Sequence, residues 1–426
     1  MPLGLLGLPG TAIRWASKHG FTRAGINAAA RKGDEQARFF TDPAVRQQPY
    51  AFYTTIRDTA PLVRGRLMWA TARHDLVSAV LRHDAFGVAF ADRPLPAPVA
   101  LMFRFSRRSA PIGPVDPPSM LVVDPPDHTR YRRLVSKVFT ARAIEGLRPR
   151  IEQTCDELLR DRPADLVAGF ASLLPVTVIA EILGIPLDMR RQFLAWGNAA
   201  APTLDLGLPF LTYRQTEINI RRVNVWMRGH FARLRRDPGD DLLSQLVRLD
   251  DLSDDELLAT AGLLLAAGFE TTVNLLGTGA WLLMRHPRQL AILRDEPQRW
   301  GNAVQEALRY DSPVQVTARV CRREAELGGQ RIEPGRVVMA MLGGANRDPG
   351  VFADPDRFDV TRANAREHLS FSGGVHYCLG AALARLEGEI GLRMLFERYP
   401  GLRIDGTPQR RGTRVLRGFS RLPVTI

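Results

Sequence analysis

The chain has 426 residues, 45% of them hydrophobic, which is enough to bury a large core in one large domain or two average ones. The formal net charge of +13 comes mostly from arginine scattered along the sequence, a pattern that argues against nucleic acid as a partner. The three cysteines lie far apart and do not suit a disulfide framework, so we expect a reducing compartment, the cytoplasm.

The N-terminal stretch, residues 1–40, is basic and has few apolar positions after residue 10. Proline and glycine interrupt its first ten residues and no basic region precedes them, so they do not resemble a secretory signal. We expect a frayed extension, with contact to a membrane surface as the alternative. No stretch reaches the about 20 uncharged apolar residues of a transmembrane helix, so we expect no membrane span.

Residues 42–86 read as helix, hairpin and helix, with helices predicted over 50–59 and 74–82 and alternation over 62–71 around a turn at Gly65. Residues 87–123 have no period and are rich in proline. A loop of that length is usually functional or mobile.

A helix is predicted to start at Asp124-Pro125-Pro126-Asp127. At about 100° per residue, His128 and Arg132 share one face of this helix, and Arg130, Arg133 and Lys137 gather on the opposite face. Two cationic faces indicate two separate roles, although a solvated basic helix is the simpler alternative.

Helices are predicted over most of residues 141–236, with a break over 196–211 that is rich in Ala, Pro, Gly and Leu. A capping box at Ser253-Asp254-Asp255-Glu256 then begins a helix that continues to residue 286, about 48 Å in length. This helix is apolar on almost every side, so we expect it to be buried.

The one interior acid of that helix is Glu270, in the segment Ala267-Gly268-Phe269-Glu270-Thr271-Thr272. A buried carboxylate is costly unless it is paired, and a structural salt bridge is one explanation for it. The other explanation is that Gly268 allows the helix to open locally, so that Glu270 and Thr271 hold water at a reaction site.

The next helix, 300–310, contains Glu306 and Arg309, a spacing that is usually an exposed ion pair. Strands are predicted over 314–322 and 337–342, with a turn at Gly328-Gly329 between them. Residues 413–426 read as a closing strand pair that turns at Gly418-Phe419.

The segment Phe371-Ser372-Gly373-Gly374-Val375-His376-Tyr377-Cys378-Leu379-Gly380 delivers one cysteine to the start of a helix that ends before Pro400. Helix N–H groups lower the pKa of a cysteine at this position, which favours the thiolate, a soft ligand for iron. A buried structural cysteine is the alternative.

This segment resembles the haem-binding signature of the cytochromes P450. The segments Ala267–Thr272 and Glu306-x-x-Arg309 resemble two further motifs of that family, in the family's order and spacing. The resemblance covers about residues 40–426 and implies a mainly α fold with a large helical domain and a smaller β-rich portion over residues 41–426.

The same resemblance implies haem b as the cofactor, with Cys378 as the axial ligand of the iron. Glu270 and Thr271 match the positions that deliver protons to dioxygen. Propionate contacts are implied for His128, Arg132, Arg319 and His376. The motif residues Glu306 and Arg309, together with Arg357, match a structural brace.

As a function, the resemblance implies a monooxygenase that inserts one oxygen atom of O₂ into an apolar organic substrate, by hydroxylation or epoxidation. We expect a polyketide or macrolide, a fatty acid, or a terpenoid or sterol, because the break over 196–211 matches the family's mobile lid and is largely apolar. In the long loop, Phe90, Leu101, Met102 and Phe103 are candidate substrate contacts, as are residues 314–317 and the Gly418-Phe419 turn.

Electrons would come from NAD(P)H through a reductase and a ferredoxin that docks on the basic outer face of helix 124–137. One alternative is the same fold acting as a peroxygenase or coupling enzyme. The other is a non-catalytic haem-binding or ligand-binding protein.

Overall fold

The computed structural model describes residues 8–89, 110–249 and 251–426. The candidate substrate contacts Phe90, Leu101, Met102 and Phe103 lie outside these described residues.

Helices dominate the chain, as predicted. They are α1 (Leu8–Trp15), α2 (Phe21–Arg31), α3 (Glu35–Thr41), α4 (Pro43–Gln47), α5 (Pro49–Thr59), α6 (His74–Arg82), α8 (Asp127–Ser136), α9 (Ala141–Glu145), α10 (Arg148–Arg160), α11 (Leu173–Ile182), α12 (Arg190–Ala200), α13 (Phe210–Arg236), α14 (Leu242–Leu246), α15 (Asp254–Arg285), α16 (Pro287–Asp295), α17 (Trp300–Tyr310), α18 (Leu342–Ala345) and α19 (Ala381–Arg398).

The strands are short. They are β1 (Val63–Arg64), β2 (Trp69–Thr71), β3 (Phe86–Gly87), β4 (Thr317–Cys321), β5 (Ala325–Leu327), β6 (Gln330–Ile332), β7 (Val337–Ala340), β8 (Arg403–Ile404), β9 (Gln409–Arg410), β10 (Phe419–Arg421) and β11 (Val424–Thr425).

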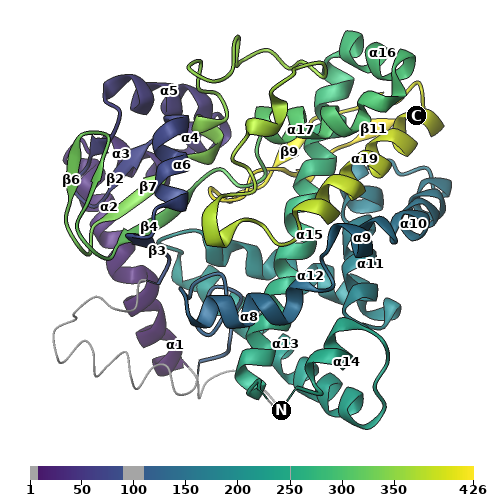
Figure 1. Ribbon diagram of the computed structural model, residues 1–426, viewed down its shortest axis with the longest axis horizontal. Coiled ribbons are helices and arrows are strands. Elements are labelled where there is room, and N and C mark those ends of the chain that lie inside the picture. The colour runs from purple at the N-terminus through teal and green to yellow at the C-terminus, as the bar shows by residue number, and fades with distance from the viewer. Residues whose placement is uncertain (1–7, 90–109, 250) are drawn as a thin grey trace.

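The long helix α15 passes through the helical part of the molecule, and most of the sheet lies to one side with α3, α5 and α6 (Figure 1). The main sheet has the order β1-β2-β7-β4-β3, in which β2 and β7 are parallel and the other pairs are antiparallel. The predicted hairpin over 62–71 is β1 and β2, and the predicted helix 74–82 is α6. The mainly α architecture with a smaller β-rich portion is therefore confirmed.

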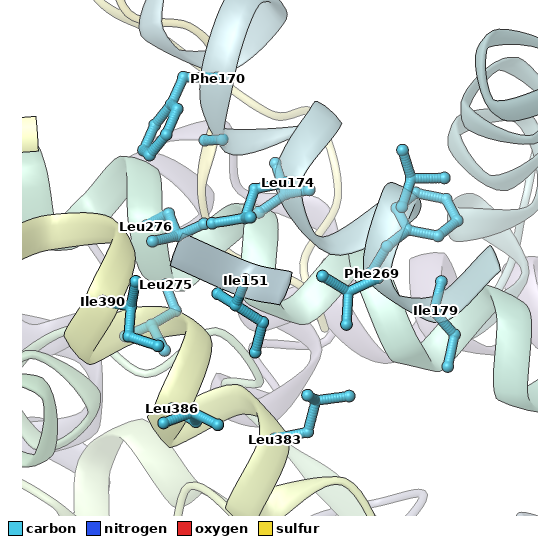
Figure 2. Packing of buried hydrophobic residues seen from close by; sticks show 14 of the residues in the cluster. Ile151, Phe170, Leu174, Ile179, Phe269, Leu275, Leu276, Leu383, Leu386 and Ile390 are labelled. Atoms are coloured by element: carbon cyan, nitrogen blue, oxygen red, sulfur yellow. The ribbon is translucent and has the colours of Figure 1, made fainter. Parts of the chain in front are cut away.

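Helix α15 starts at the predicted capping box, in which Ser253 and Glu256 satisfy each other's backbone N–H groups. It packs against α11 and α19, and Figure 2 shows the apolar side chains of these helices together, among them Ile179, Leu276 and Ile390. By length and composition α15 could cross a membrane, but 67% of its most apolar window is buried within the protein. Its apolar surface is thus explained by its central position in the core.

The expected frayed N-terminus is not what the structure shows. Helices α1 and α2 fold back, and α1 packs on α13, where Arg14 forms a buried ion pair with Glu217. The indole N–H of Trp15 also donates to the Leu208 carbonyl at 2.8 Å. Buried pairing of this kind fixes a segment that its composition alone predicts to be loose, while a domain boundary after residue 40 stays a prediction.

The expected strand pair over 413–426 is also different. Strand β10 pairs with β9 and β11 pairs with β8, so the two C-terminal strands extend two separate ribbons instead of pairing with each other. Gly418 lies against Asn274 of α15, where a Cβ would collide with that side chain, and Phe419 packs on Trp281. The C-terminal segment is therefore tied to the central helix.

Candidate active site

The cysteine loop, residues 371–380, lies directly before α19, as predicted. The Cys378 N–H donates to the Phe371 carbonyl at 2.9 Å, which closes the loop. Gly374 has a φ of 62°, and a Cβ there would collide with the Leu81 carbonyl oxygen of α6. Glycine is therefore required at this position to let the loop approach α6.

The Cys378 side chain is exposed, whereas the other two cysteines are buried. Desolvation by the surrounding protein raises the pKa of the Cys378 thiol, against smaller opposing effects of the Gly380 backbone N–H, Arg132 and Arg385. The backbone N–H at the helix start thus lowers this pKa as predicted, but desolvation outweighs it for the free thiol. A coordinating metal ion would itself remove the proton.

Four cationic or ionisable side chains expected at the cofactor gather beside this loop from three segments: His128 and Arg132 from α8, Arg319 from β4, and His376 from the loop itself. The His128 and His376 rings have centroids 4.3 Å apart. Arg319 is 4% exposed and reaches the Ser372 hydroxyl at 3.4 Å. The tertiary fold therefore brings together all of these predicted residues.

Their electrostatics favour an anion. Burial, with the charges of His376 and Arg132, lowers the pKa of His128 to about 4, and burial lowers the pKa of Arg319 to about 10. Burial is the main cause of both shifts, and the nearby charge of Asp124 offsets only part of it. Among the described residues, His128 Nδ1 is buried without a hydrogen-bond partner, and His376 Nε2 has the Asp124 carboxylate at 3.6 Å.

These features fit a haem group. The buried His128 Nδ1 without a partner, the adjacent His376 ring and two arginines suit the two propionates of haem b, and an exposed thiol suits its iron. At Gly380 an added Cβ would meet no atom within 4 Å, so there is open space directly after Cys378. The donor set and the space next to it are both consistent with the cofactor that the sequence predicts.

Asp124 is a further residue of this region, and its place in the sequence predicts only the start of a helix. Its carboxylate accepts from the Val88 and Ala89 N–H groups and pairs with Arg322, and its Oδ1 lies 3.6 Å from His376 Nε2. It thereby ties the strand β3 region to the cysteine loop. Its position before two prolines gave no signal of that role.

Glu270 and Thr271 occupy different environments although they are adjacent on α15. Glu270 is 3% exposed, and its Oε1 lies 2.7 Å from Arg411 Nη1, so the salt-bridge explanation of this acid holds in the structure. Burial raises the pKa of Glu270, against the opposing charge of Arg411. The Thr271 hydroxyl instead donates to the Ala267 carbonyl at 3.1 Å.

The expected opening of α15 at Gly268 is not present, because the helix runs unbroken from Asp254 to Arg285. A Cβ at Gly268 would lie 2.8 Å from Ile179 Cγ1 of α11. Glycine at this position therefore allows α11 to approach α15 closely, a function that sequence spacing did not indicate.

Glu306 and Arg309 are fully buried and form two hydrogen bonds, of 2.7 and 2.8 Å. The third member of this network is Arg362, whose Nε lies 3.3 Å from Glu306 Oε1. The prediction of Arg357 for this place is wrong, because its side chain is 62% exposed and only its carbonyl accepts from Arg309. Arg357 and Arg362 are five residues apart, and only the fold of the intervening backbone decides which of them reaches Glu306.

A groove of about 290 Å³ adjoins the cysteine loop on the side of α6 and α19. Arg82, Arg366 and Arg385 line it, together with Phe371 and Tyr377. Arg133 on α8 and Lys137 directly after this helix are exposed as predicted, but Arg130 pairs with Glu256 of α15. The predicted basic face is thus smaller on α8 than expected.

Comparisons with known proteins agree with this site. The family model described as Cytochrome P450 matches residues 223–410. Cytochrome P450 140 of Mycobacterium tuberculosis is 48% identical over 97% of both chains, and 6-deoxyerythronolide B hydroxylase of Saccharopolyspora erythraea is 44% identical over 71% of this chain and 76% of its own.

Among solved structures, P450BioI in complex with an acyl carrier protein ligated to hexadec-9Z-enoic acid superposes with a TM-score of 0.83. The match covers 90% of this chain and 100% of that one, at 34% identity. With the cysteine loop, the Glu306-Arg309 network and the matched length in agreement, the chain belongs to the cytochrome P450 monooxygenase family.

Proposed function

We propose that this protein binds haem b through Cys378 and inserts one oxygen atom of O₂ into a largely apolar organic substrate. The observation that carries the proposal is the exposed Cys378 thiol next to the His376 ring, two arginines and the buried His128 Nδ1, which has no hydrogen-bond partner among the described residues. When bound, haem with a thiolate ligand supplies the oxygen-activating chemistry.

The residues of this chain would divide the work. Arg132, Arg319, His128 and His376 would hold the propionates by charge-assisted hydrogen bonds, and this would orient the cofactor over Cys378. Because these side chains come from α8, from β4 and from the cysteine loop, bound haem would also hold these three segments together.

Glu270 and Thr271 would deliver protons. Thr271 would hold a proton at Oγ1, and Glu270 would replace it, for which its carboxyl must leave Arg411 at least transiently. A raised pKa of Glu270 supports this role, since it makes the protonated form more accessible.

In Thr271→Ala we expect NAD(P)H use to continue with less product per electron pair. Thr260→Ala, about three turns earlier on α15, is the control and should keep normal coupling. Unchanged coupling in Thr271→Ala would remove the proposed role.

For the substrate, we retain a polyketide or macrolide, a fatty acid, or a terpenoid or sterol. Two relatives support this proposal. One is named 6-deoxyerythronolide B hydroxylase, and the other, P450BioI, is described in complex with an acyl carrier protein ligated to hexadec-9Z-enoic acid. CYP109E1 from Bacillus megaterium, 30% identical with a TM-score of 0.79, is described in complex with testosterone.

For electron supply, we propose NAD(P)H, a reductase and a ferredoxin in the cytoplasm. An acidic ferredoxin would dock beside the cysteine loop, where Arg133, Lys137 and the groove arginines are exposed or lie at the surface.

The deciding experiment is the absorption spectrum of the reduced, carbon monoxide-bound protein. We expect the Soret band of a thiolate-ligated haem, and its loss in Cys378→Ser. Cys155→Ser is the matched control, because Cys155 is buried in the core, and it should leave the band in place. A protein without haem absorbance, or a Cys378→Ser spectrum identical to wild type, would contradict the proposal.

A further inference from the structure

The two N-terminal helices contact the break between α12 and α13. We call residues 8–31, which comprise α1, α2 and the turn between them, the strap, and residues 196–211, which resemble the family's mobile lid, the lid. The indole N–H of Trp15 in the strap donates to the Leu208 carbonyl in the lid at 2.8 Å. Trp15 also packs edge-on against Phe210, with ring centroids 5.6 Å apart. Strap and lid therefore meet through a polar and an apolar contact of one side chain.

Further strap side chains bond to the lid backbone. Gly207 and Leu208 are buried and lie outside any helix or strand. The Leu208 N–H donates to His19 Nδ1 at 3.4 Å, and the Gly207 carbonyl accepts from Arg23 Nη1 at 3.0 Å. Burial lowers the pKa of His19 to about 4, so its ring is neutral at neutral pH and can accept this bond. Because buried backbone groups need partners, this conformation of the lid depends on the strap.

The shape of the lid backbone also suits the strap. Gly207 has a φ of 70°, and an added Cβ there would lie 3.3 Å from Arg23 Cα. Glycine adopts this left-handed conformation at little cost and leaves room for α2. On α1, Arg14 pairs with Glu217 of α13 in a buried position, and a buried charge that loses its partner is strongly destabilising. The strap is therefore anchored beside the lid.

The other end of the lid reaches the part of α15 that carries Glu270. An added Cβ at Gly197 would collide with the ring of Phe269, so the lid backbone lies directly on α15 there. Asn198 Oδ1 accepts from Arg411 Nη1 at 3.1 Å, and the same nitrogen lies 2.7 Å from Glu270. The lid thus contacts the strap at one end and the proposed proton-delivery residues at the other.

We propose that the strap holds the lid over the active site and thereby sets how fast bulky compounds enter it. That the space beyond the lid is an active site rests on the proposed function. Trp15 and Arg23 are positioning residues, because they touch the lid and not the reacting groups. Loss of their bonds would raise the population of open lid, since it removes interactions that only the closed state makes.

Hydrogen–deuterium exchange of the full-length protein tests the contact itself. Trp15→Phe removes the indole N–H and keeps an aromatic ring against Phe210, and Arg23→Met removes the guanidinium donor and keeps an apolar side chain. In the double variant we expect the lid amides, Leu208 among them, to exchange at least about 10-fold faster than in wild type. An unchanged exchange rate would overturn the proposal.

Matched substitutions show whether the effect is local. The control is Trp69→Phe/Arg31→Met, in which Trp69 lies on β2 of the main sheet and Arg31 is exposed at the end of α2. This variant should exchange its lid amides as wild type does, and equal acceleration in both double variants would refute the role of the strap contacts. Acceleration that extends to the buried amides of α15 would show a general loss of stability and would also refute it.

A second measurement tests access to the site. Stopped-flow binding of phenylimidazole to the haem-loaded protein should be faster by about 3-fold or more in Trp15→Phe/Arg23→Met, with a smaller change for imidazole, which is less bulky. Equal changes for the two probes, or none, would show that the strap does not control entry. Exchange is measured without turnover, so unchanged exchange contradicts the strap alone, whereas a missing thiolate spectrum contradicts the proposed function.

Discussion

Glu306 illustrates how strongly one buried residue depends on its partners. Its carboxylate accepts from Arg309, from Arg362 and from the Asp359 N–H, and both oxygens are fully buried. Removing one cationic partner leaves part of that negative charge without compensation.

We therefore predict that Arg362→Ala lowers the free energy of unfolding by about 1–3 kcal/mol and reduces haem retention. Arg357→Ala is the matched control, five residues away and 62% exposed, and should change stability by less than about 0.5 kcal/mol. Denaturant unfolding and the haem content of the purified variants measure both effects. Equal losses in the two variants would show that Arg362 is not the third member of the network.

Glu387 on α19 is a second buried acid, and unlike Glu306 it has no cationic partner among the described residues. Neither of its carboxylate oxygens has a hydrogen-bond partner among the described residues, and burial raises its pKa to about 8, against a smaller effect of Thr272. Below pH 4.5 the folded and unfolded chains both hold this proton. Between pH 4.5 and about 8 only the folded chain keeps it, so stability falls as the pH rises through this window.

Glu387→Gln removes this titration while it keeps the shape of the side chain. Relative to wild type, the variant should gain on the order of a few kcal/mol between pH 5 and pH 9, measured by urea unfolding at each pH. Glu389→Gln, two residues along α19 at a partly exposed position paired with Arg148, is the control and should show no such gain. A pH-independent difference between Glu387→Gln and wild type would contradict the raised pKa.

At the scale of an element, α15 serves both the core and the site. Its glycines differ in purpose: a Cβ at Gly262 would meet no atom within 4 Å, but at Gly268 it would meet Ile179, which is 1% exposed and has little room to move. Helical propensity thus governs the first position, and packing against α11 governs the second.

We predict that Gly262→Ala raises stability by about 0.5–1 kcal/mol, because alanine favours the helix and nothing opposes its methyl group. Gly268→Ala should instead lower stability by about 1–3 kcal/mol, since α11 and α15 must separate or Ile179 must shift. Thermal unfolding of the two variants gives the comparison. A stabilising Gly268→Ala would mean that the close approach of α11 to α15 is not required.

At the scale of the whole molecule, the net charge of +13 can attract a partner only through those basic side chains that do not already pair within the fold. Many pair within the fold, as Arg130 does with Glu256 and Arg150 with Glu181. Arg133 on α8 and Lys137 directly after it are exposed, and no ion pair to either is seen in the part of the chain that the structure describes. Surface charge of this kind raises the association rate with an acidic partner and is screened by salt.

The double variant Arg133→Glu/Lys137→Glu should therefore slow electron transfer from an acidic ferredoxin, with a change of about 10-fold or more in the association rate at low salt. Stopped-flow reduction at several ionic strengths measures this. Arg222→Glu, an exposed position on α13, controls for the change in net charge and should have a much smaller effect. If both variants slow the reaction equally, α8 does not form the docking surface.

The sequence by itself determined the elements whose signals are local. The capping box began α15 at the predicted residue, turn residues separated β1 from β2, and the glycines around Cys378 placed that cysteine directly before α19. Family motifs then indicated the cofactor and grouped His128, Arg132, Arg319 and His376, which the fold brings together. Hydrogen-bond capping and turn geometry act over a few residues, so the sequence carries them directly.

Only the tertiary structure decided which distant residues meet. It fixed the N-terminal helices through Arg14 and Glu217, gave Glu306 the partner Arg362 in place of Arg357, and paired Glu270 with Arg411. It also gathered five arginines around one small cavity. The physical reason is the same in each case: burial makes a charge depend on whichever partner the packed chain places within a few ångströms, and spacing along the sequence does not report that distance.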